Sequence, residues 1–185
     1  MVKDALSEAE NRMKGAIIAL DEDLATIRTG RASPALVERL MVDYYGTPTA
    51  LVQLATISAP EPRMLTIRPF DPASIKDIER TIQTSDLGLT PSNDGKLIRL
   101  MIPALTEERR FELVRGVKSR AEEGRVSVRN VRRDALNDLR DFEREKMISE
   151  DDLKRGEDDL QKLTDRYVEQ INAIADRKEK EVLEV

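Results

Sequence analysis

The spacing of apolar residues divides the chain into three parts, and the first part has the period of a helix. Between Asp4 and Arg28 the apolar positions recur in steps of three and four residues, as they do in a helix that packs in a bundle. These positions are Leu6, Ala9, Met13, Ala16, Leu20, Leu24 and Ile27. Gly30 suits the left-handed conformation that ends many helices. The sequence therefore predicts a first bundle helix that ends at Thr29–Gly30.

The second part, residues 31–105, has a pattern typical of short strands separated by turns. Glycine and proline recur along it, at Gly46, Pro48, Pro60, Pro62, Pro69, Gly88, Pro91 and Gly95. Four strand-like runs lie between them, over residues 39–45, 50–58, 63–68 and 97–102. In the last run Ile98, Leu100 and Ile102 alternate with Arg99 and Met101, which indicates a strand with one buried face.

One helix is predicted inside this second part, from Pro72 to Thr84. Ile75, Ile78 and Ile82 fall on one side of such a helix, and proline is well tolerated in its first turn. Strands and a helix together predict a small α+β domain.

In the third part the helical period returns after Pro103. Thr106 followed by Glu107 and Glu108 has the features of a helix start, a hydroxyl cap and acids at the positive end of the dipole. The apolar positions are Leu113, Val117, Ala121, Val128, Val131, Ala135, Leu139 and Phe142. A helix that continues to Lys146 would be roughly 60 Å long at 1.5 Å per residue.

A last helix is predicted from Ser149, which is followed by three acids. Its apolar positions are Leu153, Leu160, Leu163, Tyr167, Ile171, Ile174 and Val182.

These parts predict an α+β protein with a discontinuous bundle domain. The bundle would comprise residues 1–29 and 106–185, and residues 30–105 would form an inserted α+β domain. Two connections join them, near residues 29–31 and 103–106, and their glycine and proline suggest a hinge at Thr29, Gly30, Pro103 and Ala104. The alternative is one continuous core in which these segments are ordinary loops.

The amino-acid composition excludes several classes of function for this protein. Charged residues make up 36% of the chain and aromatics 3%, which favours long solvated helices. The chain has no cysteine and no histidine, so disulfides, thiolate chemistry and the commonest general base are excluded. The first residues lack the pattern of a signal peptide, and no apolar run is long enough to span a bilayer. We therefore expect a cytoplasmic protein that makes no membrane contact.

Charge is distributed unevenly along the chain. The formal net charge is −5, yet residues 106–147 carry twelve basic and ten acidic groups, a net +2. The stretch from Arg125 to Arg133 contains no acid. On a helical wheel its four arginines lie about 100° from the apolar positions. We call Arg125, Arg129, Arg132 and Arg133 the arginine stripe.

The stripe has two interpretations. Its arginines could be solvated, or could bridge to acids of the last helix such as Glu157, Asp158 and Asp159. Alternatively, they could bind a polyanion, because the guanidinium group makes paired hydrogen bonds to phosphate. The second interpretation predicts RNA or DNA as the partner.

Seven stretches of the sequence resemble the ribosome recycling factor family, in order and over the whole chain. They are IRTGRASP (27–34), DYYGTP (43–48), SDLGLTP (85–91), PALTEERR (103–110), VRNVRRDA (128–135), ISEDD (148–152) and DLQKLTD (159–165). The resemblance implies a monomer shaped like an L, in which a three-helix bundle and a β/α/β sandwich-like domain meet at a hinge. It also implies the activity of that family, the splitting of post-termination ribosomes into subunits with elongation factor G and GTP.

The resemblance further implies which residues contact RNA. Arg129, Arg132 and Arg133 would lie against large-subunit ribosomal RNA at the intersubunit bridges, and Arg28 and Arg31 would make secondary contacts. Elongation factor G would push the smaller domain.

Two other classes of function are possible. Paired acids at Asp151–Asp152 and Asp158–Asp159, or the Asn93–Asp94–Gly95 turn, could hold Mg²⁺ in an enzyme. Helix starts and turns use the same residues for capping, so we expect no catalysis, no metal and no cofactor. No phosphate-binding glycine loop is present either. A helical RNA-binding or coiled-coil scaffold without ribosome-splitting activity is the remaining alternative.

Overall fold

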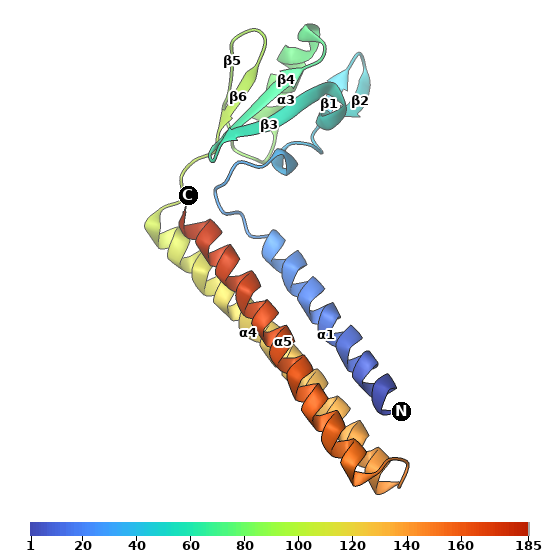
Figure 1. The fold of residues 1–185 in the computed structure, drawn as a ribbon. Coiled ribbons are helices and arrows are strands. Elements are labelled where there is room, and N and C mark those ends of the chain that lie inside the picture. The colour runs from blue at the N-terminus through green and yellow to red at the C-terminus, as the bar shows by residue number, and fades with distance from the viewer. Residues whose placement is uncertain (185) are drawn as a thin grey trace. The chain divides into compact units, whose positions relative to one another are not determined.

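The protein, described here by a computed structural model of residues 1–184, divides into two compact units (Figure 1). The helical unit comprises Met1–Arg28 and Glu107–Glu184, and the sheet unit comprises Thr29–Thr106. Each unit has its own cluster of buried apolar residues, and the two clusters share no residue. The predicted α+β class, with a bundle of long helices and a separate part that contains strands, is confirmed.

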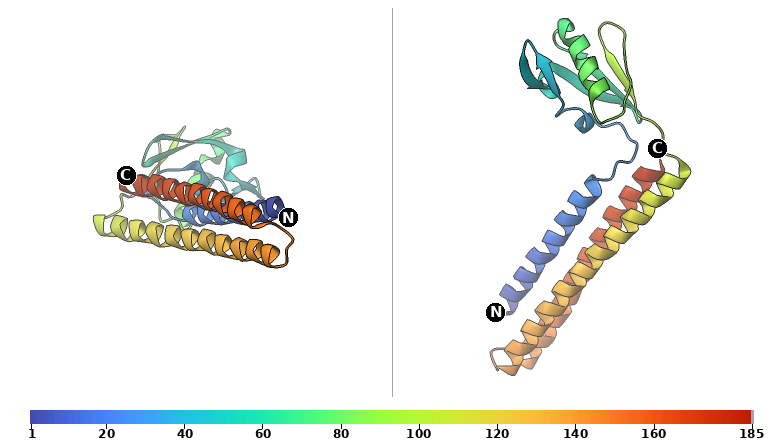
Figure 2. Two further views of the ribbon diagram at one scale, coloured as in Figure 1. Left: turned by 60° about the horizontal axis from the view of Figure 1, so that its bottom comes forward. Right: turned by 180° about the vertical axis from the view of Figure 1, so that it is seen from behind.

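Three helices form the helical unit: α1 (Val2–Ala25), α4 (Glu107–Arg144) and α5 (Glu150–Leu183). Helix α1 runs antiparallel to α4, since Arg12 pairs with Asp134 and Asp23 with Arg120. Helices α4 and α5 are also antiparallel and are joined by a short turn (Figure 2). Among residues 1–184, none of the helices combines the length and the apolar character that crossing a bilayer requires.

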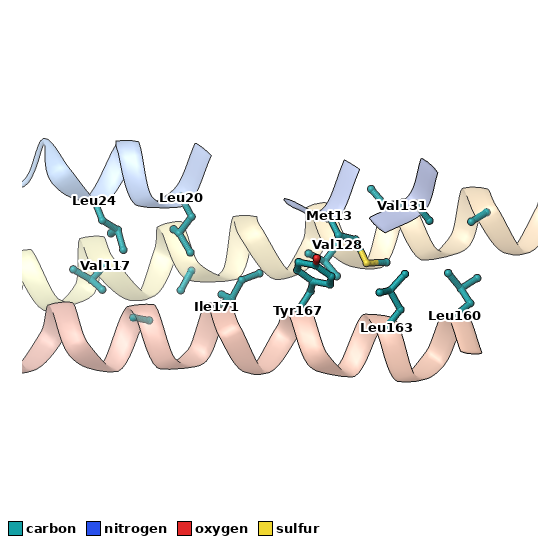
Figure 3. Packing of buried hydrophobic residues seen from close by; sticks show 14 of the residues in the cluster. Met13, Leu20, Leu24, Val117, Val128, Val131, Leu160, Leu163, Tyr167 and Ile171 are labelled. Atoms are coloured by element: carbon teal, nitrogen blue, oxygen red, sulfur yellow. The ribbon is translucent and has the colours of Figure 1, made fainter. Parts of the chain in front are cut away.

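Most of the predicted apolar positions of the three helices lie in the core of the bundle, and Leu113 and Val182 are the two that lie outside it. Met13, Val128 and Tyr167 come from three different helices and meet in one layer (Figure 3). Met13, Leu139 and Ile171 are completely buried. Because burial of one such side chain stabilises a protein by about 1.5–3 kcal/mol, this row of contacts is the main source of the bundle's stability.

Helix α1 ends earlier than the sequence predicts. Its last residue is Ala25, whereas the predicted end was at Thr29–Gly30. The hydroxyl of Thr26 donates to the carbonyl of Asp23 at 2.6 Å, and a side chain that bonds the backbone in this way competes with helix continuation. Gly30 does adopt the left-handed region, with φ of 75°, but in the connection after the helix.

The sheet unit holds two antiparallel sheets and one longer helix. A hairpin is formed by β1 (Met41–Tyr44) and β2 (Thr47–Ala50). The larger sheet has the order β3-β4-β6-β5, and all its pairs are antiparallel. Its strands are β3 (Ala55–Glu61), β4 (Met64–Pro69), β5 (Pro91–Asn93) and β6 (Ile98–Met101). The shorter helical pieces are η1 (Pro34–Leu36), α2 (Leu51–Leu54) and η2 (Pro72–Ser74).

Helix α3 (Ile75–Thr84) packs its isoleucine side into the core of the sheet unit. Ile78 and Ile82 are completely buried there, as the spacing predicts. The alternation predicted for β6 is also confirmed, since Ile98 and Leu100 are buried and Arg99 points to solvent. The helix contacts both β1 and β5.

The prediction of one strand over residues 50–58 is wrong. A single helical turn, α2, separates β2 from β3. Leu51 and Leu54, three residues apart, are both buried by this turn, whereas a strand would send them to opposite faces. The amide of Leu51 donates to the carbonyl of Leu40 at 2.9 Å and fixes the turn in place.

Two short strands were not predicted, because proline marked their residues as turns. Pro48 lies in β2 and Pro91 in β5. Strand β5 is at the edge of its sheet, and β2 pairs with β1 in a sheet of two strands. An edge strand tolerates proline because one row of its amides has no partner in the sheet.

Candidate nucleic-acid interface

Helix α4 carries the arginine stripe along a flank that the core leaves uncovered. Val128 and Val131 point into the bundle and are 0% and 5% exposed. Arg129 and Arg133, one and two residues further along the helix, are exposed. Since the helix is continuous from Glu107 to Arg144, the four arginines are held on one rigid element.

Arg125 is the most enclosed member of the stripe, with 24% of its side chain exposed. Its Nε donates to Oε2 of Glu122 at 2.8 Å, and a terminal nitrogen donates to Oδ1 of Asn172 on α5 at 2.8 Å. This side chain therefore links α4 to α5 as well as contributing charge.

Arg129 shares the same carboxylate. One of its terminal nitrogens donates to Oε1 of Glu122, and 53% of its side chain is exposed. Hydrogen bonds from Arg125 and then from Arg129 lower the pKa of Glu122 below its usual value of 4.5. Glu122 is therefore ionised at neutral pH and offsets part of the stripe's charge.

Arg132 and Arg133 are arranged differently. Arg132 is half-buried, Arg133 is exposed, and neither forms a salt bridge within residues 1–184. No stripe arginine in that range pairs with the acids of α5; Arg140 does so instead, with 3.4 Å between its Nε and Oε1 of Glu157. The donors of Arg132 and Arg133 are thus available to an external anion.

Glu122 and Asn172 are the two residues of this site that the sequence did not indicate. Glu122 precedes Arg125 by three residues and Arg129 by seven, and these spacings place all three on one flank of a helix. That signal was present in the sequence. The partner on α5 could not be found in the same way, because it depends on the register between two helices.

The other predicted site residues lie outside the stripe. Arg28, past the end of α1, is the last residue of the first segment of the helical unit, and Arg31 belongs to the sheet unit; both are exposed. Of the predicted hinge residues, Thr29 is buried, and Pro103 and Ala104 are exposed.

Two of the acids considered as metal ligands, Asp152 and Asp94, take part in local structure. Asp152 belongs to the N-cap of α5, where its carboxylate accepts hydrogen bonds from Ser149. Oδ1 of Asp94 accepts from the amides of Lys96 and Leu97 at 3.0 and 2.9 Å. Both arrangements are those expected of a cap and a turn.

The fold defines a class of protein, a bundle of three long helices that carries an inserted α+β unit. Comparison with known sequences gives the family. A family description, "Ribosome recycling factor", matches residues 20–183. The chain belongs to this family.

Relatives of this chain match it from end to end. Ribosome-recycling factors from Roseiflexus castenholzii and from Syntrophomonas wolfei subsp. wolfei are 59% and 57% identical over 185 residues, which is 100% of both chains in each case.

Solved structures agree with the sequence comparison. The solution structure of a ribosome recycling factor matches with a TM-score of 0.72 at 44% identity, over 100% of this chain and 98% of the other. A second match has a TM-score of 0.63 at 45% identity and covers 99% of both chains. It is a T. thermophilus ribosome recycling factor, in a structure described as that factor and E. coli elongation factor G bound to the E. coli post-termination complex.

Proposed function

We propose that this protein is a cytoplasmic translation factor that dissociates post-termination ribosomes into subunits, together with elongation factor G and GTP. Its membership of the ribosome recycling factor family supports this function. The relative bound to a post-termination complex with elongation factor G supports the ribosome and that factor as its partners.

In this proposal the helical unit holds large-subunit ribosomal RNA at the intersubunit bridges. The observation that carries the proposal is the pair of neighbouring guanidinium groups, Arg132 and Arg133, which have no acidic partner within residues 1–184. Arg125 and Arg129 add positive charge beside them, and Arg28 and Arg31 make secondary contacts. Arginine suits this role because its planar fork makes paired hydrogen bonds to phosphate.

The sheet unit receives the push of elongation factor G, and the connections at Thr29–Gly30 and Pro103–Ala104 act as the hinge. Elongation factor G consumes the GTP in this scheme. We expect the chain itself to act as a monomer without metal or cofactor. Because its sequence offers no phosphate-binding glycine loop, we expect it not to hydrolyse the GTP.

Substitution of the two unpaired arginines tests this function. We expect Arg132→Ala and Arg133→Ala each to weaken binding to purified ribosomes by roughly 1–3 kcal/mol and to slow subunit splitting in proportion. The melting temperature of Arg133→Ala should change little, because exposed arginines contribute little to folding, and that of Arg132→Ala should fall slightly more, because the stem of this half-buried side chain packs against the helix surface.

Lys162→Ala is the matched control for these variants. Lys162 is 79% exposed on α5 and lies next to acidic residues, so its loss removes the same charge from a surface that should not meet RNA. Ribosome binding that Arg132→Ala and Arg133→Ala leave unchanged would contradict the proposed interface, as would a large fall in melting temperature with binding intact.

A further inference from the structure

A carboxylate of the protein itself, that of Glu122, lies beside the first two arginines of the arginine stripe. Glu122 lies one turn before Arg125 and two turns before Arg129, and its two oxygens accept from both arginines. Half of the stripe is therefore occupied by an internal anion in the free protein. The other half, Arg132 and Arg133, is not.

A carboxylate and a phosphate bind the same hydrogen-bond donors of an arginine. The planar carboxylate and the tetrahedral phosphate each present two anionic oxygens that can accept two parallel hydrogen bonds from the guanidinium fork. In the free protein Arg129 gives one hydrogen bond to Glu122, so an RNA phosphate that approaches this arginine meets a second anion at the same guanidinium group and must share the group with Glu122 or displace it. The two anions cannot both take the full set of donors of one arginine.

The exposure of the side chains decides which pair can exchange partners. Glu122 and Arg129 are 52% and 53% exposed, so RNA can reach both without any change in the helix. Arg125 is more enclosed and keeps a second partner in Asn172 at 2.8 Å. We therefore expect RNA phosphate to replace Glu122 at Arg129, while Arg125 keeps its hydrogen bond to the carboxylate of Glu122.

We propose that Glu122 competes with RNA phosphate for Arg129 and so limits the affinity of the arginine stripe for ribosomal RNA. This inference rests on the proposed function. A factor that splits ribosomes repeatedly has to leave them after each round, and an internal anion that recaptures Arg129 favours release. Glu122 is thus a residue that sets affinity, in contrast to Arg132 and Arg133, which supply it.

The neighbouring residue offers a matched comparison. Glu123 is exposed and forms no salt bridge within the described residues 1–184. It lies about 100° further round the helix, where it lines a hollow with Ala16 and Arg120 beside α1. Glu122→Gln and Glu123→Gln therefore change the net charge of the protein equally, but only the first frees stripe arginines.

Binding to purified vacant ribosomes, measured at several salt concentrations, tests the proposal. We expect Glu122→Gln to bind about two- to fivefold more tightly than the natural protein, which corresponds to about 0.4–1 kcal/mol, the upper part of the range for exposed ion pairs. Its binding should also fall more steeply with salt, because one more phosphate contact adds about 0.7–0.9 to the slope. Glu123→Gln should bind less than twofold more tightly and keep the natural slope.

Combination with Arg129→Ala shows whether the effect passes through this arginine. In that background Glu122→Gln should lose most of its gain in affinity. Thermal unfolding of all variants provides the check on folding, and glutamine preserves the helix propensity of glutamate.

Two results would overturn the proposal. Equal binding by Glu122→Gln and Glu123→Gln would show that only the change in net charge matters. Weaker binding by Glu122→Gln than by the natural protein would show that the carboxylate positions Arg129 for RNA and does not compete with RNA. Arg132→Ala, measured in parallel, separates this failure from that of the proposed function. If Arg132→Ala weakens binding and Glu122→Gln does not strengthen it, only the role of Glu122 is wrong.

Discussion

The start of α5 is fixed by two residues that cap each other. Oγ of Ser149 accepts from the amide of Asp152 at 3.1 Å, and Oδ2 of Asp152 accepts from the amide and the hydroxyl of Ser149 at 3.3 and 2.7 Å. Lys146, just before this cap, has a φ of 59° and turns the chain back from α4. The antiparallel pairing of the two longest helices thus begins from a local hydrogen-bonded turn.

This cap predicts a dependence of stability on pH. The hydrogen bonds from Ser149 lower the pKa of Asp152 below its ordinary value of 3.8. A lowered pKa in the folded state stabilises the protein above about pH 3.8, and this contribution is lost as the pH falls below that value. Asp152→Asn should therefore be less stable than the natural protein at pH 7, and the difference should shrink toward pH 3 or so.

Urea unfolding at both pH values measures this difference, with Asp151→Asn as the control. Asp151 lies in the same first turn and meets the same helix dipole, but it takes no part in the cap. Equal losses of stability from the two variants at pH 7 would show that the dipole, and not the cap, accounts for the effect.

The sheet unit has a similar local anchor at Asp71. The hydroxyls of Tyr44 and Tyr45 both donate to its Oδ2, at 3.3 and 3.2 Å. Oδ1 accepts from the amide of Ala73 at 2.9 Å, and this backbone hydrogen bond is the main reason that the pKa of Asp71 is lowered. One carboxylate therefore ties the β1–β2 hairpin to the segment that leads into α3.

At the scale of the helices, glycine has different roles at different positions. Around Gly116 in α4 a Cβ would find nothing within 4 Å, so this glycine only weakens the helix. At Gly156 in α5 a Cβ would lie 3.1 Å from Cδ1 of Leu139 and 3.2 Å from Cγ1 of Val2. The absence of a side chain at Gly156 lets α1, α4 and α5 approach one another there.

Alanine substitution should therefore change the free energy of unfolding differently at the two positions. Gly116→Ala should stabilise the protein by about 0.4–1 kcal/mol, because alanine favours the helix and restricts the unfolded chain. Gly156→Ala should lose that gain, since the completely buried Leu139 must move to make room. Free energies of unfolding in urea compare the two, and an equal gain at both positions would contradict this reading of the packing.

Helices were more predictable than strands, and the reason lies in their length. The period of α4 extends over 38 residues, so many apolar positions agree on one face. Strand β5 has three residues and begins with Pro91, which indicates a turn when it is considered alone. Only the neighbouring strand β6, which pairs with it, makes this segment a strand.

The candidate site was predictable in its positions but not in its pairing. The helical periodicity of the sequence predicts that the arginine stripe lies beside the apolar side of the helix. Val128 and Val131, on that apolar side, are buried. The absence of acids between Arg125 and Arg133 suggested an unpaired group of charges. Glu122, which lies outside the acid-free stretch, pairs with Arg125 and Arg129 from the preceding turn of the helix. Whether an arginine is paired therefore depends on which residues are neighbours on the helix surface, and not on the absence of acids from one stretch of sequence.

At the scale of the whole molecule, the two separate cores have a mechanical consequence. The two clusters of buried residues share no member, so we expect each unit to keep its packing while the connections between them change. Within residues 1–184 the chain passes between the units at two places, after Arg28 and after Thr106. Gly30, next to the first crossing, adopts a φ of 75° and can absorb dihedral changes that a residue with a Cβ resists.

The proposed mechanism requires motion between the units, because one part holds RNA while elongation factor G drives the other. The cysteine-free chain allows this requirement to be tested with one engineered disulfide that joins the units. Cysteine pairs, one residue in each unit, would be screened for complete and reversible oxidation. The single-cysteine variants, treated with the same oxidant, are the controls.

The rate of subunit splitting by the locked protein, measured with purified ribosomes, elongation factor G and GTP, shows whether splitting requires motion between the units. We predict that the oxidised protein binds ribosomes nearly as well as the natural protein, splits them far more slowly, and recovers its rate on reduction. Splitting at the natural rate in the oxidised form would show that the connections are passive and that the mechanism needs no motion between the units.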